Sequence, residues 1–211
     1  FVPSRGLGDV YKRQNMSIYI NTDNGVTFNG VSSVTSADVV ASNGVVHIVD
    51  AVIGLPSVVT FALADPNFSS LVQALTAYDY PQSFVGLLSI PAGSAPSPFT
   101  VFAPVNSGFE SLLDELGVNS LYDIDEQTLG AVLSYHVVVS VNQMSNTLSD
   151  GMVITTSLAQ ANPSIADLTF NVGDNGEGIL TDNNGRTSNI IAVDVQADNG
   201  IIHAIDTVVL P

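Results

Sequence analysis

The spacing of apolar residues predicts three helices between positions 66 and 136. In the first helix, apolar residues recur every three or four positions and therefore share one face: Phe68, Leu71, Val72, Leu75 and Tyr78. Asp65 followed by Pro66 is typical of a helix start. We expect a second helix from Asn106 to a stop at Gly117, and a third that begins near Asp125.

Short apolar runs separated by Asn, Asp and Gly turns predict strands in the second half of the chain. One more strand is expected just before the second helix. The predicted strands are 99–103, 153–157, 168–172, 190–195 and 201–209. Residues 81–98 contain several prolines and are expected to form a surface loop. Helices first and strands afterwards predict an α+β fold, with an antiparallel β core and helices packed at one side.

A segment at 43–53 is repeated at 199–209. Polar and glycine residues of the two copies are identical at a separation of 156 positions: Asn43 and Asn199, Gly44 and Gly200, His47 and His203, Asp50 and Asp206. Each copy is followed by Leu-Pro. Because the stretch 57–211 has nearly the same length as this separation, the repeat predicts tandem domains.

The repeat divides the chain into parts. We expect 57–211 to form a complete domain, and 15–56 to be the C-terminal fragment of a preceding domain of the same kind, about 100 residues of which would lie upstream. Residues 1–14 differ in charge and pattern, and we interpret them as an expression or sequence-assembly scar that is not native. Without helices to cover it, the fragment 15–56 should be loosely ordered or lie against the complete domain.

The charge balance excludes several classes of function. The 211 residues carry 20 acidic and 4 basic side chains, for a net charge of −16, and after residue 14 the only basic residue is Arg186. Such a chain does not bind nucleic acid or an anionic bilayer through basic side chains. It has no cysteine for a disulfide, a catalytic thiol or a thiolate metal site. No apolar run reaches the ~18 residues that membrane insertion needs.

Three segments resemble the fasciclin domain family. Residues 100–109 (TVFAPVNSGF) are similar to the family's first signature, 133–138 (LSYHVV) to its central Tyr-His segment, and 199–211 to its closing signature. The residues that carry the two outer motifs are Thr100, Phe102, Ala103, Pro104, Asn106, Phe109, Asn199, Gly200, His203 and Asp206. Val105 and the Ser107-Gly108 pair depart from the family pattern, and Gly108 costs a helix ~1 kcal/mol relative to Ala.

The resemblance implies a fasciclin-like wedge or sandwich, with one complete domain preceded by the C-terminal part of another. It also implies a role in adhesion at cell surfaces. Because the Tyr-His segment of animal fasciclin domains is tied to integrin-mediated adhesion, the resemblance nominates Tyr135 and His136 as ligand-binding residues. The competing interpretation of His136 is a packed core histidine, since it shares a helix face with apolar residues.

The residues of these motifs also allow structural predictions that do not depend on the family resemblance. Asn106 is expected to cap the helix behind the 99–104 strand. Asn199 and Gly200 are expected to form a tight turn in which the glycine takes a positive φ. The following strand has apolar residues on both faces and belongs in the middle of a core. His203 and Asp206 lie three apart on that strand and hence on opposite faces, which is poor geometry for a catalytic triad. We expect His203 to be a buried histidine with satisfied nitrogens.

Acidic residues gather at two places without the spacing of a calcium loop. Asp123, Asp125 and Glu126 suit a helix N-terminus, and the acids between 174 and 182 suit solvent-exposed turns. We therefore predict no metal, no cofactor and no catalytic residues, and the protein is not expected to be an enzyme.

The predicted function is that of an extracellular or cell-surface adhesion module acting through tandem repeats. Its partners would be surface or matrix proteins or polysaccharides, with homophilic contacts possible and no direct membrane insertion. One alternative is a small-molecule or polysaccharide binder, or an enzyme, on the same scaffold. A further alternative is a structural spacer in a large surface protein.

Overall fold

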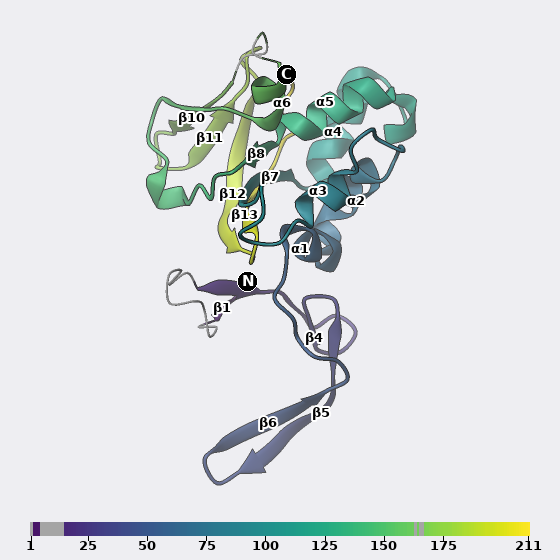
Figure 1. Ribbon diagram of the computed structural model, residues 1–211, viewed down its shortest axis with the longest axis vertical. Helices are drawn as coiled ribbons and strands as arrows, with labels where there is room; N and C mark the ends of the chain where they lie inside the picture. The colour runs from purple at the N-terminus through teal and green to yellow at the C-terminus, as the bar shows by residue number, and fades with distance from the viewer. Residues whose placement is uncertain (1, 5–14, 163, 165–166) are drawn as a thin grey trace.

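The computed structural model describes residues 2–4, 15–162, 164 and 167–211. Most of the segment 1–14 lies outside the described residues, so its interpretation as a scar stays a prediction. Figure 1 shows a body of helices and sheet built from the later part of the chain, below which a long hairpin from the earlier part projects.

The elements follow one another in this order. The helices are α1 Val58–Ala64, α2 Ser69–Leu75, α3 Phe84–Leu88, α4 Asn106–Leu116, α5 Glu126–Tyr135 and α6 Ser157–Ala161, with short 3-10 turns at Pro66–Phe68, Leu121–Asp123 and Ser145–Thr147. The strands are β1 Val2–Ser4, β2 Met16–Ile18, β3 Ile20–Asn21, β4 Thr27–Phe28, β5 Ser32–Ala41, β6 Gly44–Val49, β7 Phe99–Pro104, β8 Val137–Val139, β9 Met152–Ile154, β10 Leu168–Val172, β11 Gly178–Thr181, β12 Thr187–Gln196 and β13 Gly200–Ile205.

Side-chain caps set the starts of several helices. Ser57 and Thr60 form a capping box at α1, and the Asp125 carboxylate accepts a hydrogen bond from the backbone N–H of Thr128 at α5. Gly117 ends α4 in the left-handed conformation, with φ of 66°. The stop at Gly117 and the start at Asp125 agree with the sequence prediction, whereas α2 ends at Leu75, before Tyr78.

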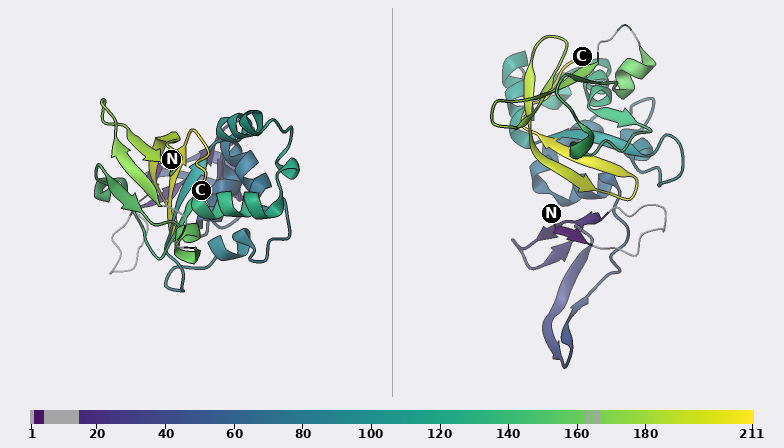
Figure 2. Two further views of the ribbon diagram at one scale, coloured as in Figure 1. Left: turned by 90° about the horizontal axis from the view of Figure 1, so that it is seen from above. Right: turned by 90° about the vertical axis from the view of Figure 1, so that its left-hand side faces the viewer.

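A seven-stranded sheet has the order β8-β7-β13-β12-β11-β10-β9. All neighbouring strands are antiparallel except β13 and β7, which run parallel. The helices α1 to α5 gather at one side of this sheet (Figures 1 and 2). This is the expected α+β arrangement, with one parallel pair formed by the second and third strands from the β8 edge.

The body has two apolar clusters. The larger lies between the helices and the sheet, and the smaller lies among the strands around Phe102, Tyr135 and Leu180. The strand predicted at 201–209 ends at Ile205, but Val208 and Val209 continue into the interior and are fully buried. The buried part of this segment therefore extends beyond the end of the strand.

The predicted loop at 81–98 is wrong in part, because it contains α3. Ser83 caps this helix by accepting a hydrogen bond from the N–H of Gly86. Phe84 and Leu88 are buried on its inner face. Two short helices, α1 and α6, and strand β11 were not predicted at all. Each is too short for a periodic pattern to stand out.

Two parts of the segment 15–56 contact the body formed by residues 57–211. The Ser17 hydroxyl accepts a hydrogen bond of 3.0 Å from the N–H of Gln196, and the N–H of Asp198 donates to the Pro56 carbonyl over 2.8 Å. The hairpin β5–β6 extends away from the body (Figure 1), and most of its residues are exposed.

The hairpins β5–β6 and β12–β13 have the same internal geometry. Their strand partners correspond one to one at the 156-residue separation, with register shifts at the same two places. Asp38 and Asp194 occupy equivalent bulges with φ of 60° and 59°. The repeat found in the sequence is therefore a repeat of structure.

Candidate functional site

Asn199 connects the closing motif to two helices. Its side-chain oxygen accepts a hydrogen bond of 3.0 Å from the N–H of Val58 at the start of α1. Its side-chain nitrogen donates to the carbonyls of Leu88 and Ile90 at the end of α3, over 2.7 and 2.9 Å. The side chain is fully buried. Asn199 therefore holds α1 and α3 on the edge of the β12–β13 turn.

Gly200 does not take the positive φ that the sequence reading assigned to it. It is glycine for a different reason. A Cβ at this position would overlap the carbonyl oxygen of Phe99, because β7 pairs with β13 at this residue. The glycine allows close approach of a neighbouring strand rather than a tight turn.

His203 and Asp206 occupy separate hydrogen-bond networks. His203 is buried and stacks on Phe102, its Nε2 lies 2.8 Å from the Gln143 carbonyl, and its Nδ1 accepts from the N–H of Asp194. Burial lowers the pKa of His203, so the ring stays neutral. The Asp206 carboxylate accepts from Asn189.

Asp206 remains ionised in spite of its partial burial. Burial acts to raise the pKa of Asp206, but hydrogen bonds from Asn189, Thr207 and Ser188 outweigh it and lower the pKa. His203 and Asp206 make no contact with each other that could form a nucleophile–base relay. His203 is bonded to the bulge of β12 at Asp194, and Asp206, just after β13, is bonded to Asn189 near the start of β12.

The opening motif builds the contact between β7 and α4. The Thr100 hydroxyl donates to the Val141 carbonyl and accepts from the N–H of Gln143, both over 2.9 Å, and Phe102 faces the smaller apolar cluster. Ala103 and Phe109 face the larger one, and Pro104 ends β7.

Asn106 is not the cap of α4. Val105 occupies that position, and no side chain caps the helix. Instead, the Asn106 side chain accepts a hydrogen bond from the N–H of Ser70 over 2.9 Å and donates to the Pro66 carbonyl. Gly108 faces the closing motif, since a Cβ there would lie 2.8 Å from the Asp206 carbonyl oxygen. Glycine at position 108, which departs from the family pattern, therefore allows α4 to pack closely against the closing motif.

The structure places Tyr135 and His136 inside the domain, with exposed fractions of 0% and 3%. The Nδ1 of His136 donates to the Val132 carbonyl over 2.7 Å, and its Nε2 accepts from the N–H of Val209. Burial lowers the pKa of His136 to about 4 and raises that of Tyr135 to about 12. Both side chains act here as core residues, and their assignment to ligand binding stays a prediction.

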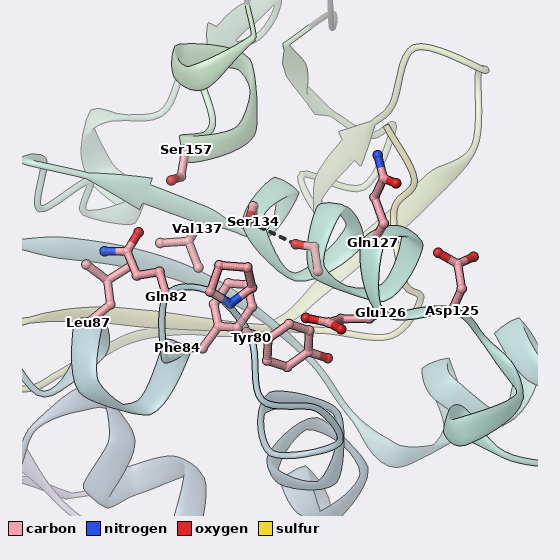
Figure 3. Close-up of a pocket in the computed structure, with 12 residues that line it drawn as sticks. Tyr80, Gln82, Phe84, Leu87, Asp125, Glu126, Gln127, Ser134, Val137 and Ser157 are labelled. Carbon is pink, nitrogen blue, oxygen red and sulfur yellow. Dashed lines mark hydrogen bonds between the residues drawn. The ribbon is translucent and has the colours of Figure 1, made fainter.

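A pocket of about 560 Å³ opens between α3, α5 and the start of α6 (Figure 3). Its apolar lining consists of Tyr80, Pro81, Phe84, Leu87 and Val137. Polar groups from the same elements surround this lining, namely Gln82, Asp125, Glu126, Gln127, Ser134 and Ser157. The arrangement, an apolar wall with a few polar groups, is typical of a small-ligand site.

Aromatic packing fixes the pocket wall. Tyr80 meets Phe84 edge-on with ring centroids 4.9 Å apart, and its hydroxyl donates to the Ala74 carbonyl over 2.9 Å. Gly130 of α5 faces the Tyr80 ring. Burial raises the pKa of Tyr80 to about 12, with contributions from Tyr78 and Glu126. Tyr80 therefore presents a neutral ring.

The rim of the pocket is acidic and rich in acceptors. Figure 3 shows Asp125 and Gln127 pointing outward from the first turn of α5, at the end of the pocket opposite Gln82. Hydrogen bonds from Thr128 lower the pKa of Asp125. The Ser134 hydroxyl donates to the Gly130 carbonyl over 2.9 Å, which leaves its oxygen free to accept.

The sequence reading missed this pocket because it treated residues 81–98 as a plain loop. The pattern Tyr80, Phe84, Leu87 with Ser83 as a cap could have indicated a short helix with one aromatic face. Nothing in the sequence indicates that this face meets α5.

The acidic clusters have local roles. Asp123 accepts from the N–H of Asn119, Glu177 accepts from that of Asn175, and Asp182 accepts from several backbone N–H groups. Within the described part of the chain, no three His, Asp or Glu side chains come together as a metal site would require. In the same part, no helix is both long and apolar enough to cross a bilayer.

Comparison with known proteins identifies the family. A family model described as fasciclin domain matches residues 5–56 and 66–211. Among curated relatives, the Synechocystis protein sll1735 is 32% identical over 156 residues, covering 74% of this chain and 98% of its own. Human periostin is 29% identical over 93% of this chain, which spans 21% of periostin.

A solved structure shows the same fold. It is a FAS1 domain pair from the insect cell adhesion molecule fasciclin I, with a TM-score of 0.60, 23% identity, and coverage of 92% of this chain and 67% of that one. The chain therefore belongs to the fasciclin domain family, whose model it matches in two separate segments.

Proposed function

We propose that this chain is a non-enzymatic adhesion module of an extracellular or cell-surface protein, acting as part of a tandem array. The observation that carries the proposal is the repetition of one structural unit within one chain: hairpins β5–β6 and β12–β13 share register, bulges and motif residues. Repeated weak sites on one chain gain effective concentration and bind by avidity. The fold neighbour, itself a domain pair of a cell adhesion molecule, supports this reading.

The partners would be surface or matrix proteins or polysaccharides, with homophilic contacts possible. Like-charged copies with a net charge of −16 repel one another at low ionic strength. Salt screens that repulsion and divalent cations neutralise it. We therefore expect adhesion to strengthen with NaCl and with Ca²⁺.

Aggregation of beads coated with the chain tests this proposal. The coated beads should aggregate, or bind matrix-coated surfaces, more strongly when NaCl or Ca²⁺ is added. Beads coated with an unrelated globular protein of similar negative charge serve as the control. Insensitivity to both additions, or equal aggregation of the control beads, would contradict the adhesion proposal.

A second candidate function is favoured by the pocket in Figure 3. Tyr80 and Phe84 offer aromatic surface, and the rim offers carboxylate, amide and hydroxyl acceptors from α5. Sugar rings present C–H groups that pack on aromatic surface and hydroxyls that donate to such acceptors. The alternative function is therefore binding of a saccharide unit of a polysaccharide in this pocket.

Ligand-observed NMR with a panel of neutral oligosaccharides tests the second candidate. Saturation transfer to one or more sugars should be weakened by Gln127→Ala and Asp125→Asn, which alter the rim. Glu110→Gln, on the exposed face of α4, is a control of similar charge change. If no sugar gives a signal, or if the rim variants bind as the parent chain does, the pocket is not a saccharide site.

A further inference from the structure

One carboxylate of the pocket in Figure 3 is available to a ligand. Figure 3 shows the Glu126 side chain pointing from the first turn of α5 toward Tyr80, and its charge contributes to the raised pKa of Tyr80. Within the described part of the chain, Glu126 has no hydrogen bond and no ion pair. Asp125 differs, because its carboxylate already caps α5 by accepting from the N–H of Thr128.

No basic side chain between residues 57 and 211 offsets this charge. The only Lys or Arg in that range is Arg186, which is bound to Glu115 over 2.6 Å and to Asp182 over 3.5 Å, away from the pocket lining. The two histidines of the same range are buried and have lowered pKa values, so they stay neutral. A positive group that pairs with Glu126 therefore has to come from outside this range.

The wall beside Glu126 is aromatic. The Tyr80 hydroxyl is occupied by the Ala74 carbonyl, and Phe84 lies edge-on to the Tyr80 ring. Gly130 contributes no side chain to the pocket, and a Cβ there would lie 3.5 Å from two carbons of the Tyr80 ring. An aromatic surface of this kind packs against apolar C–H groups and attracts a nearby cation. The pocket thus offers a carboxylate and an aromatic wall to the same ligand.

We propose that the pocket binds an amino sugar, a unit of a polysaccharide that carries a protonated amine. The inference rests on the saccharide function proposed above for this pocket and specifies its ligand. The ammonium group pairs with Glu126, and the C–H face of the sugar ring packs against Tyr80. The sugar hydroxyls donate to acceptors on the remaining wall, such as Gln82 and Ser134.

A lysine side chain of a partner protein is the less favoured occupant. It has a single polar group at its tip, which would satisfy Glu126 alone. The pocket of about 560 Å³ has further polar groups on three other segments, among them Gln82, Ser134 and Ser157. Hydroxyls spread around a sugar ring can reach several of these groups at once, so the distribution of polar groups favours the amino sugar.

The experiment is calorimetric titration of the full chain with two probes that differ only in N-acetylation. The first is a chitosan tetrasaccharide, built of glucosamine, and the second is its fully N-acetylated, neutral counterpart. At low salt and slightly acidic pH, the charged probe should bind about fivefold or more tightly than the neutral one. Added NaCl should reduce this preference, because it screens the attraction to Glu126.

Two variants locate the preference in the pocket. Glu126→Gln should remove it and leave the affinity for the neutral probe unchanged, whereas Glu110→Gln, an equal charge change on the exposed face of α4, should keep it. Gly130→Ala places a methyl group against Tyr80 and should weaken the binding of both probes. Its melting temperature should not fall, since alanine favours a helix over glycine.

The outcomes separate this inference from the proposal on which it rests. If neither probe binds, the saccharide function itself fails. If the neutral probe binds as tightly as the charged one, or if Glu126→Gln keeps the preference, the saccharide function stands and the amino-sugar inference is overturned. A lysine-rich peptide that binds as tightly as the charged probe, with the same dependence on Glu126, would overturn it in favour of a basic polypeptide.

Discussion

The hairpins β5–β6 and β12–β13 are two copies of one local structure in opposite surroundings. His203 is fully buried against Phe102, whereas the side chain of the equivalent His47 is 47% exposed. Ile201 is fully buried and the equivalent Val45 is 54% exposed. Register and bulges are nevertheless the same. The difference teaches that the hairpin is specified by its own residues, while burial comes from the strand and helices that pack on it.

The comparison also distinguishes motif residues that stabilise their own hairpin from those that contact other elements. Asp50 and Asp206 both close their hairpin through a backbone N–H. Asn199 and Gly200, by contrast, act on β7, α1 and α3, outside their own hairpin. Their counterparts at positions 43 and 44 are exposed. These two positions therefore serve the partner elements and not the hairpin itself.

The largest contrast is expected between Gly200→Val and Gly44→Val. The side chain at position 200 would overlap the backbone of β7, and the free energy of unfolding should fall by more than about 4 kcal/mol. The same change at position 44 meets open space and should alter it by less than ~0.5 kcal/mol. Urea denaturation followed by circular dichroism measures both. Equal costs at the two positions would break the comparison.

Acidification should destabilise the body formed by residues 57–211 through its buried histidines. The pKa of His136 is about 4 in the folded chain and ~6.5 unfolded, so the unfolded state binds more protons between these values. Stability is therefore fully present above pH ~6.5 and is lost as pH falls toward 4, by about 3 kcal/mol for this residue. The pKa of His203 is lowered by burial in the same direction.

Urea titrations between pH 7 and 4.5 measure this loss. His136→Gln should flatten the pH profile. A slope that persists in full after His136→Gln would show that another group carries it.

Asn199→Ala should lower the free energy of unfolding by about 2 kcal/mol. The substitution leaves the N–H of Val58 and the carbonyls of Leu88 and Ile90 without their side-chain partner. Asn43→Ala should change the free energy of unfolding by less than ~0.5 kcal/mol. Thermal denaturation of the two variants gives the comparison directly. A cost at position 43 matching that at 199 would mean that Asn43 has a partner of its own.

The last prediction concerns local cleavage of the exposed hairpin, which should leave the body formed by residues 57–211 folded. Proteinase K should cut the exposed hairpin between residues 37 and 47 first and remove the N-terminal part, leaving 57–211 resistant. Mass spectrometry of the time course identifies the cuts. Equal resistance along the whole chain would show that the boundary near residue 57 is misplaced.

Much of the fold could be predicted because its signals are local. The Asp125 cap, the Gly117 stop and the strand Leu168–Val172 each follow from a few neighbouring residues. The repeat spacing predicted that the two hairpins would match, since identical short motifs impose the same turn and bulge.

What could not be predicted depends on residues far apart in the chain. The reason for Gly200 lies in Phe99, and the role of Asn106 lies in Pro66 and Ser70. The pocket requires that Tyr80 and Gly130 meet. No pattern within one segment carries such pairings, because they arise only when helices and sheet pack together.

The parallel pairing of β13 with β7 also bears on how the domain is made. The two strands are separated by about a hundred residues. During translation, β7 and the helices leave the ribosome long before β13, so the sheet cannot be completed until β13 has emerged. The strands of the hairpin β5–β6 pair with each other and with the nearby β4, so this unit can form as soon as it is synthesised.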